Sequence, residues 1–505
     1  MSQPRRRAVA AALRPFRLVP ALLAASLCLA GCNWLQFAGS SSHQGNNSSE
    51  STVTVANVSG LHQLFQTTLP STADGAPAFV ENVSTPGGTH NLLFVTTRAG
   101  DLVAVDAVSG AIVWQAHHPA GSCKINNGST TCYTTSSPVI DPDLQYVYTY
   151  GLDGYVHKHA IGTGTEVTDA HWPVLSTLKP WDEKGSSALS TATDSTGTTY
   201  LYSVHSGYPG DGGDYQGHVT AIDLATGTSH VWNSLCSNLT VHFVPSTQAG
   251  TDCPEVQSGI WARPGVTYDS ATDEIYLSTG NAIFDPTTHQ WGDTVAALHP
   301  DGTGTAGGDP LNSFTPTNYA ALNTADADLG STLPALLPSD ANATYKDLGV
   351  QGGKDAKLRF LNMSDLGGHG AAGFTGGEIG AIVNVPQGSQ VLCAPVVWRD
   401  ASKNIWIFVT TYNGLSGIRI GTAANGTPSF LSQWQTTGAA TPSTPHIANG
   451  VLYVAAGSTM HAYNPTTGAS LWSAAIGSIH WESPVVADGR LYISDGGNHL
   501  TGFGL

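Results

Sequence analysis

A repeated segment constrains this chain more than any other sequence feature. It reads Ala, then Asp or Asn, then a Ser/Thr-Gly turn, then Trp, and it occurs at residues 104–114 (AVDAVSGAIVW), 221–232 (AIDLATGTSHVW) and 462–472 (AYNPTTGASLW). The turn glycine permits a positive φ between two strands, and the tryptophan offers a large apolar face to a neighbouring unit. The segments therefore predict hairpins within a repeated all-β unit.

Strands that open in Ser-Pro, or in a related pair, recur along the chain. These openings occur at Pro77, Pro138, Ala188, Pro264, Pro334, Pro395, Pro445 and Pro484. Eight copies of a four-strand unit of about 40 residues or more predict an all-β, eight-bladed propeller. The last copy reaches the C-terminus with only three strands, so we expect residues 61–69 (LHQLFQTTL) to supply the fourth strand and close the ring. The propeller would then span residues 61–505.

The N-terminus has the features of an export signal. Residues 1–17 carry five arginines and no acidic residue, and the apolar run over residues 18–30 is too short for an ordinary membrane span. The run ends in Leu-Ala-Gly-Cys32, which resembles the bacterial lipoprotein cleavage box. The resemblance implies a signal peptide over residues 1–31, a lipid on Cys32 and, in a host with two membranes, anchoring to the outer membrane on its periplasmic face.

The alternative is an ordinary signal peptide that contains a cysteine. Residues 32–60 are rich in Ser, Asn and Gly, so we expect them to form a flexible tether and a short leading segment ahead of the propeller.

Composition and cysteine spacing narrow the class of protein further. The net charge of −17 argues against nucleic acid as a partner. Cys123 and Cys132 bracket a polar loop, and Cys236 and Cys253 bracket another, so two disulfides are predicted in an oxidising compartment. Cys393 lies in an apolar strand and is predicted to be a buried free thiol.

Polar and aromatic residues beyond the repeat gather around the fourth and fifth predicted blades. Trp261 precedes the first strand of blade 4, and Asn281 follows the next strand; Asp326 and Asp328 precede blade 5, and Lys354 occupies its next turn. Equivalent turns of adjacent blades lie at the same end of a propeller, so these side chains are expected to converge over the channel. Together these side chains offer an aromatic face, a cation and the oxygen ligands that calcium prefers.

The repeat resembles the tryptophan-docking repeats of the pyrroloquinoline-quinone (PQQ) type propeller superfamily. The order Trp, Thr-Gly-Asn, Asp-x-Asp-x-Gly-Ser and Gly-Lys-Asp is similar to that of quinoprotein alcohol and polyvinyl-alcohol dehydrogenases. By that resemblance Trp261 stacks on the quinone and Lys354 contacts it, while Asn281 and Asp326 ligate calcium. Asp326 would also be the general base, with Asp328 beside it, in the oxidation of an alcohol.

The chain also departs from these dehydrogenases. It has no adjacent cysteine pair, and no glutamate on blade 3 is evident as a calcium ligand, so Asp211 or Asp214 would have to replace it. It has no Cys-x-x-Cys-His haem motif, so an enzyme of this kind would need a separate electron acceptor.

Each candidate residue has a structural alternative. Trp261 could pack between blades, Asn281 could serve only its turn, Lys354 could be a solvated hairpin tip, and the two aspartates could be ordinary loop residues. His480-Trp481-Glu482, ahead of the last blade, could line the channel or pack. The alternative function is a non-catalytic propeller lipoprotein that binds protein partners, similar to that of the outer-membrane β-barrel assembly machinery.

Overall fold

The computed structural model describes Met1 and residues 33–505, except residues 122, 124–130, 210, 245–251, 368–373 and 439. The chain divides into two units, Met1–Gly31 and Cys32–Leu505, and the fold below belongs to the second. The predicted signal peptide and the lipidated Cys32 lie outside the described residues. Within the part of the chain that is described, no helix is long and apolar enough to cross a membrane.

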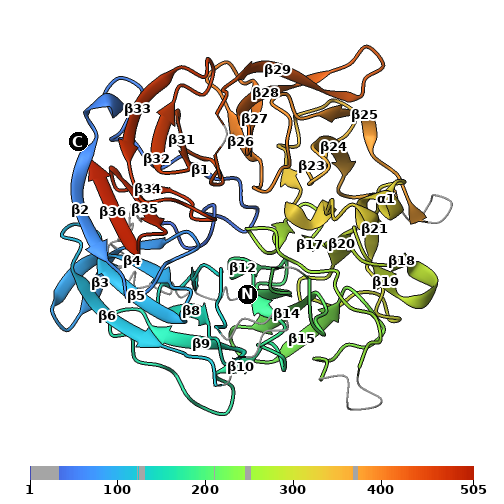
Figure 1. Cartoon of the computed structure of the whole chain (residues 1–505), viewed down its shortest axis with the longest axis horizontal. Coiled ribbons are helices and arrows are strands. Elements are labelled where there is room, and N and C mark those ends of the chain that lie inside the picture. The colour runs from blue at the N-terminus through green and yellow to red at the C-terminus, as the bar shows by residue number, and fades with distance from the viewer. Residues whose placement is uncertain are drawn as a thin grey trace. The chain divides into compact units, whose positions relative to one another are not determined.

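The second unit is an eight-bladed β-propeller, as predicted, whose antiparallel sheets follow one another in chain order around a ring (Figure 1). Blades 1 and 2 comprise β3 (Ala78–Thr85), β4 (Gly88–Thr96), β5 (Asp101–Asp106) and β6 (Ile112–His117), then β7 (Val139–Ile140), β8 (Tyr146–Tyr150), β9 (Tyr155–Ala160) and β10 (Val174–Leu175). Blades 3 and 4 comprise β12 (Ser190–Thr193), β13 (Thr199–Ser206), β14 (His218–Asp223) and β15 (Ser229–Asn233), then β16 (Thr267–Asp269), β17 (Glu274–Ser278), β20 (Val295–Leu298) and β21 (Asn312–Phe314).

The remaining blades follow the same plan. Blades 5 and 6 comprise β22 (Ala335–Leu336), β23 (Leu348–Gln351), β24 (Lys357–Asn362) and β25 (Ile379–Asn384), then β26 (Val396–Arg399), β27 (Ile405–Thr411), β28 (Gly414–Thr422) and β29 (Pro428–Gln435). Blades 7 and 8 comprise β30 (His446–Ala448), β31 (Val451–Ala456), β32 (Thr459–Tyr463) and β33 (Ser470–Ala475), then β34 (Val485–Ala487), β35 (Arg490–Asp495), β36 (His499–Gly504) and β2 (His62–Thr68).

A few short elements lie outside this plan. β11 (Lys184–Gly185) adds to β13, and a hairpin of β18 (Phe284–Asp285) and β19 (Gln290–Trp291) extends blade 4. The helices are η1 (Val58–Gly60), η2 (Pro286–Thr288), α1 (Tyr319–Thr324) and η3 (Leu329–Ser331).

The repeat tryptophans join each blade to the next. Trp114 of blade 1 donates its indole N–H to the carbonyl of Ile161 at 3.0 Å, in the following blade. Trp232 and Trp472 make the same kind of bond, to Gly308 and Leu61, at 2.9 and 2.8 Å. The indole ring needs a residue without a side chain opposite it: a Cβ on Gly164 would lie 2.5 Å from the Trp114 ring. The motif thus encodes the contact between blades.

The predicted closing strand is present, because β2 pairs antiparallel with β36. Phe65 takes the position that tryptophan holds in other blades: its ring lies against Gly110 of blade 1, where a Cβ would approach it to 2.5 Å. Thr67 donates its hydroxyl to the Gly110 carbonyl at 2.6 Å. β2 therefore covers the last sheet edge and docks onto the first blade, which closes the ring.

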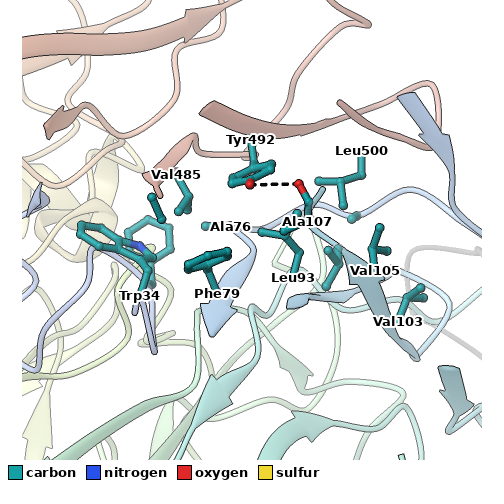
Figure 2. Packing of buried hydrophobic residues seen from close by; sticks show 14 of the residues in the cluster. Trp34, Ala76, Phe79, Leu93, Val103, Val105, Ala107, Val485, Tyr492 and Leu500 are labelled. Atoms are coloured by element: carbon teal, nitrogen blue, oxygen red, sulfur yellow. Dashed lines mark hydrogen bonds between the residues drawn. The ribbon is translucent and has the colours of Figure 1, made fainter. Parts of the chain in front are cut away.

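A hydrophobic core fills the junction between the last and first blades (Figure 2). Tyr492 of β35 stacks on Phe79 of β3 with ring centroids 6.1 Å apart, and its hydroxyl donates to the Ala107 carbonyl at 3.1 Å. Trp34, from the segment ahead of the propeller, belongs to the same core and is 4 % exposed.

Residues 33–60 differ from the flexible tether that we expected. Trp34 and Phe79 exchange both backbone hydrogen bonds, at 2.9 and 2.8 Å, and β1 (Asn46–Asn47) pairs parallel with β30. Hydrogen bonds join the segment, at or beside the inner strands of seven blades, to Phe79, Ile140, Thr191, Val266, Val397, Ile447 and Val486. These bonds place the segment inside the ring. Its polar residues, which suggested a tether, instead satisfy backbone groups at the inner strands.

The cysteines are arranged as the sequence suggested. Disulfides join Cys123 to Cys132 and Cys236 to Cys253, with Cα atoms 5.5 and 5.9 Å apart. Among the described residues, Cys393 is free and buried.

Candidate active site at the channel mouth

A cavity of about 350 Å³ lies where loops enter the inner strands of several blades. Four predicted site residues line it: Trp261, Asp326, Asp328 and Lys354. Arg263 also lines it, whereas the N-terminal segment bonds to Val266, three residues further along the same strand entry. The cavity and the segment thus contact different parts of the loop that leads into β16, which turns at the hydrogen bond from Gly265 to Ala262.

Asp328 connects the candidate residues to one another. Its Oδ1 accepts from the backbone N–H of Asn281 at 2.9 Å, and its Oδ2 accepts from the indole N–H of Trp261 at 3.1 Å. The Lys354 ammonium lies 2.9 Å from the same Oδ2. Blades 4 and 5 therefore meet at this carboxylate, with both oxygens occupied by donors.

The environment of Asp328 alters its acidity and that of its partner. Burial raises the pKa of Asp328, and Lys354 opposes part of that rise. Burial lowers the pKa of Lys354, but Asp328 and Asp326 together outweigh it, so the net shift is upward. Lys354 is therefore a cation at neutral pH, and it also lies 5.2 Å from the centroid of the Trp261 ring.

Asp326 has a different environment although it is only two residues away. Its side chain is 62 % exposed and Oδ1 lies 2.8 Å from the Lys354 ammonium. It has a φ of +49°, in the left-handed region that ordinary residues rarely adopt. Of the two aspartates, Asp326 is thus the one accessible to a substrate in the cavity.

The predicted calcium site does not fit these residues as they stand. The Lys354 ammonium lies between Asp326 and Asp328, 2.8 and 2.9 Å from their oxygens, and so holds the position of a shared cation. Asn281 contacts Asp328 through its backbone N–H and, unlike the other four predicted residues, does not line the cavity. Calcium takes six to eight oxygen ligands, so it would have to displace Lys354.

Two further cations border the cavity. Arg263 is 5 % exposed, its guanidinium lies 3.8 Å from the centroid of the Trp481 ring, and its buried Nε has no hydrogen-bond partner. Burial lowers the pKa of Lys184 to about 7, with a further contribution from Arg263. A buried guanidinium with a partnerless Nε, beside an amine that an anion would help to protonate, favours an anionic ligand.

The His480-Trp481-Glu482 cluster is part of this wall. Trp481 meets Trp261 edge to face, with centroids 6.2 Å apart. The buried carboxylate of Asp74 accepts from His480 Nδ1 at 2.9 Å and from the Trp481 backbone N–H at 3.0 Å, which fixes both residues. Burial, with repulsion from Asp74, raises the pKa of Glu482 to about 8.

The two candidate replacements for a blade 3 glutamate separate in the structure. Asp211 lines the cavity and accepts from the Tyr215 hydroxyl at 2.8 Å. Asp214 instead lies 3.6 Å from the buried ammonium of Lys179, in a network that does not line the cavity.

Sequence reasoning missed Arg263, Lys184 and Asp74. Arg263 lies two residues after Trp261 in the same strand entry, and Lys184 occupies the corresponding entry of blade 3. The residues just ahead of the first strand line the cavity in several blades. A search of the positions ahead of each Ser-Pro or related pair would therefore have found Arg263 and Lys184.

An eight-bladed ring with an aromatic, cationic cavity at the channel mouth is the architecture of a PQQ-type propeller. The family model described as the glucose/ethanol/alcohol dehydrogenase β-propeller domain matches residues 34–297, and that of the outer membrane protein assembly factor BamB matches residues 396–504. The chain belongs to the PQQ-type β-propeller family. No curated protein matches it.

Solved structures share the fold at low sequence identity. A europium-containing methanol dehydrogenase matches with a TM-score of 0.62 and 16 % identity, over 94 % of this chain and 98 % of that one. The quinohemoprotein alcohol dehydrogenase ADHIIG from Pseudomonas putida HK5 matches with a TM-score of 0.60 and 13 % identity, over 94 % and 80 %. BamB from Moraxella catarrhalis matches with a TM-score of 0.50 and 12 % identity, over 88 % and 100 %. These likenesses show the fold alone.

Proposed function

We propose that this chain is an exported, lipid-anchored quinoprotein-like oxidoreductase that holds PQQ at the channel mouth and oxidises an alcohol. The observation that carries the proposal is the convergence of Trp261, Arg263, Lys354 and Asp326 on one cavity. A planar tricarboxylate requires flat aromatic contacts and cations. The partnerless buried Nε of Arg263 and the desolvated Lys184 supply such positions.

Each residue that lines the cavity has a proposed role that follows from its environment. Trp261, held by Asp328, offers an aromatic face, while Arg263 and Lys184 are placed to bind carboxylates. When bound, the quinone supplies a two-electron acceptor. Asp326 is placed to take the proton of the substrate hydroxyl, and the adjacent Lys354 stabilises the charge near it. Because the chain has no Cys-x-x-Cys-His haem motif, such an enzyme would need a separate electron acceptor.

The experiment is calorimetric titration of the purified full chain with PQQ, in calcium and in a calcium chelator. We expect a dissociation constant of about 1 μM or lower. Because Lys354 already neutralises the two aspartates, the affinity should change less than about threefold between the two conditions. Arg263→Leu should weaken binding at least tenfold, since it removes a desolvated cation.

Arg419→Leu is the matched control, because this half-buried arginine of β28 does not line the cavity. Equal affinity of the two arginine variants would contradict the placement of the ligand. Binding that requires calcium would instead support the predicted calcium site and contradict the role given to Lys354.

The match of residues 396–504 to the BamB family model favours a second candidate, a scaffold that binds protein partners at the outer membrane. Absence of quinone binding under both conditions would support it, and partners captured by cross-linking in membranes would be the next observation.

A further inference from the structure

A cluster of imidazoles and carboxylates lies at the junction of blades 1 and 2, and none of its members lines the channel-mouth cavity. His157 and His159 belong to β9 and, being two residues apart on a strand, share one face. His118 follows β6 of the preceding blade. Glu166 follows β9 and forms a β-bridge with His159. The three histidines are buried and Glu166 is half-buried.

The side-chain nitrogens and oxygens of the cluster are close enough to share one ion. Ligand atoms of His118, His157 and Glu166 all lie within 4.8 Å of one another. His157 Nδ1 is 2.6 Å from Glu166 Oε1, and His118 Nε2 is 2.9 Å from His159 Nε2. An ion held at about 2.0–2.2 Å from each ligand needs separations of up to about 4 Å. The His118 and His157 rings are stacked with centroids 3.5 Å apart and an interplanar angle of 14°, so one ring must rotate before both can direct a lone pair at the same ion.

The hydrogen-bond partners of two imidazoles fix their orientation. The carbonyl of Gly164 can only accept, so His159 donates from Nδ1 across 3.0 Å, which leaves its Nε2 unprotonated toward His118 when the ring is neutral. His157 lies between two carboxylates, with Nε2 3.1 Å from Asp153 Oδ1 and Nδ1 2.6 Å from Glu166 Oε1, so a metal ion would replace the proton that His157 and Glu166 share. Carbonyl and carboxylate partners of this kind orient imidazoles that bind metals.

We propose that His118, His157 and Glu166, with His159 as a further nitrogen donor, bind a divalent late transition-metal ion such as zinc. Imidazole nitrogens beside a carboxylate select zinc or copper over calcium and magnesium, which prefer oxygen ligands alone. His118 comes from the end of blade 1 and the other ligands come from blade 2. The bound ion would therefore join two adjacent blades, in addition to the contact of Trp114 with Ile161.

The test is zinc binding by the full chain, purified without a histidine tag and stripped with a chelator. Equilibrium dialysis should show about one tightly held zinc per chain, and zinc but not calcium should raise the unfolding temperature. His157→Ala and Glu166→Gln should each weaken binding at least tenfold. Asp153→Asn should weaken it by about ten- to a hundredfold, through the orientation of His157 alone. Copper(II) at the site should show nitrogen hyperfine splitting from two or three imidazoles.

His461→Ala is the matched control, since this half-buried histidine of β32 in blade 7 is outside the cluster, and it should leave the affinity unchanged. Glu166→Gln alters only a half-buried side chain and decides the matter if His157→Ala does not fold. Zinc that the full chain does not retain, or that the Glu166→Gln and His461→Ala variants retain equally, would overturn the site. The cluster would then be a histidine and carboxylate ion-pair network.

Discussion

Asp326 and Asp328 are separated by one alanine, yet the structure gives them different environments. Asp328 is buried and accepts from Asn281, Trp261 and Lys354, so it organises the wall of the cavity. Asp326 is exposed and has the Lys354 ammonium as its partner. The first is a positioning residue, and the second is the one that a substrate could reach.

Asparagine substitutions should separate these roles. With PQQ bound, Asp326→Asn should lower kcat by about a hundredfold to ten-thousandfold, because it removes the proton acceptor, and should leave quinone affinity nearly unchanged. Asp328→Asn should instead weaken quinone binding and lower the free energy of unfolding by about 1–3 kcal/mol, since buried donors lose their charged acceptor. Steady-state kinetics, calorimetry and denaturant unfolding give the three readouts. The same loss of kcat in both variants, with affinity unchanged, would contradict the division.

The lowered pKa of Lys184 predicts how the affinity for PQQ depends on pH. Its folded-state pKa, lowered by burial to about 7, lies below its ordinary value, so an anionic ligand must recover the proton that burial expels. Affinity for PQQ should therefore fall as pH rises above about 7, by up to about tenfold per pH unit for this one proton. Calorimetry at pH 6, 7 and 8 measures the slope. Lys184→Met should flatten it, whereas a slope that survives the substitution would assign it to another group.

Among the elements, β2 joins the two ends of the ring. It is seven residues long, it is the outer strand of blade 8, and it carries the Phe65 and Thr67 contacts to Gly110 of blade 1. The two faces of the strand differ in burial: Phe65 is half-buried against blade 1, whereas Leu64 is 39 % exposed.

Alanine substitutions in β2 compare its two faces. Phe65→Ala should lower the free energy of unfolding by about 2–3 kcal/mol, less than the 3–5 kcal/mol of a fully buried phenylalanine because its ring is only partly covered. Leu64→Ala, on the exposed face, should change it by less than about 1 kcal/mol. Denaturant unfolding monitored by circular dichroism measures both. Similar losses would show that Phe65 does not dock the blades.

At the scale of the whole molecule, the ring depends on covering its last sheet edge. The full chain pairs β2 with β36, whereas a chain in which a Gly/Ser linker of equal length replaces residues 62–68 exposes the backbone donors and acceptors of β36 and keeps residues 33–60. The full chain should remain monomeric and the altered one should assemble into larger species, because an unpaired edge accepts strands from other copies. Size-exclusion chromatography with light scattering distinguishes them. A synthetic peptide of residues 61–69 should restore the monomer, and its failure to do so would contradict the edge explanation.

The ring, and several residues that line the cavity, could be predicted from local sequence patterns. Trp114, Trp232 and Trp472 each dock as their motif predicts, because the contact between blades is encoded locally by a turn glycine and an indole. Trp261, Asp326, Asp328 and Lys354 converge because every blade repeats one geometry, so equivalent turns must lie together.

The contacts among these residues and the position of residues 33–60 depend on long-range folding and could not be predicted from local patterns. Lys354 takes the place expected for calcium because two carboxylates from one loop approach a turn of the same blade, a distance that no spacing in the sequence specifies. The polar N-terminal segment lies inside the ring because inner strands of seven blades leave backbone groups there that it can satisfy. Those partners are hundreds of residues apart along the chain, and they become neighbours only when the ring closes.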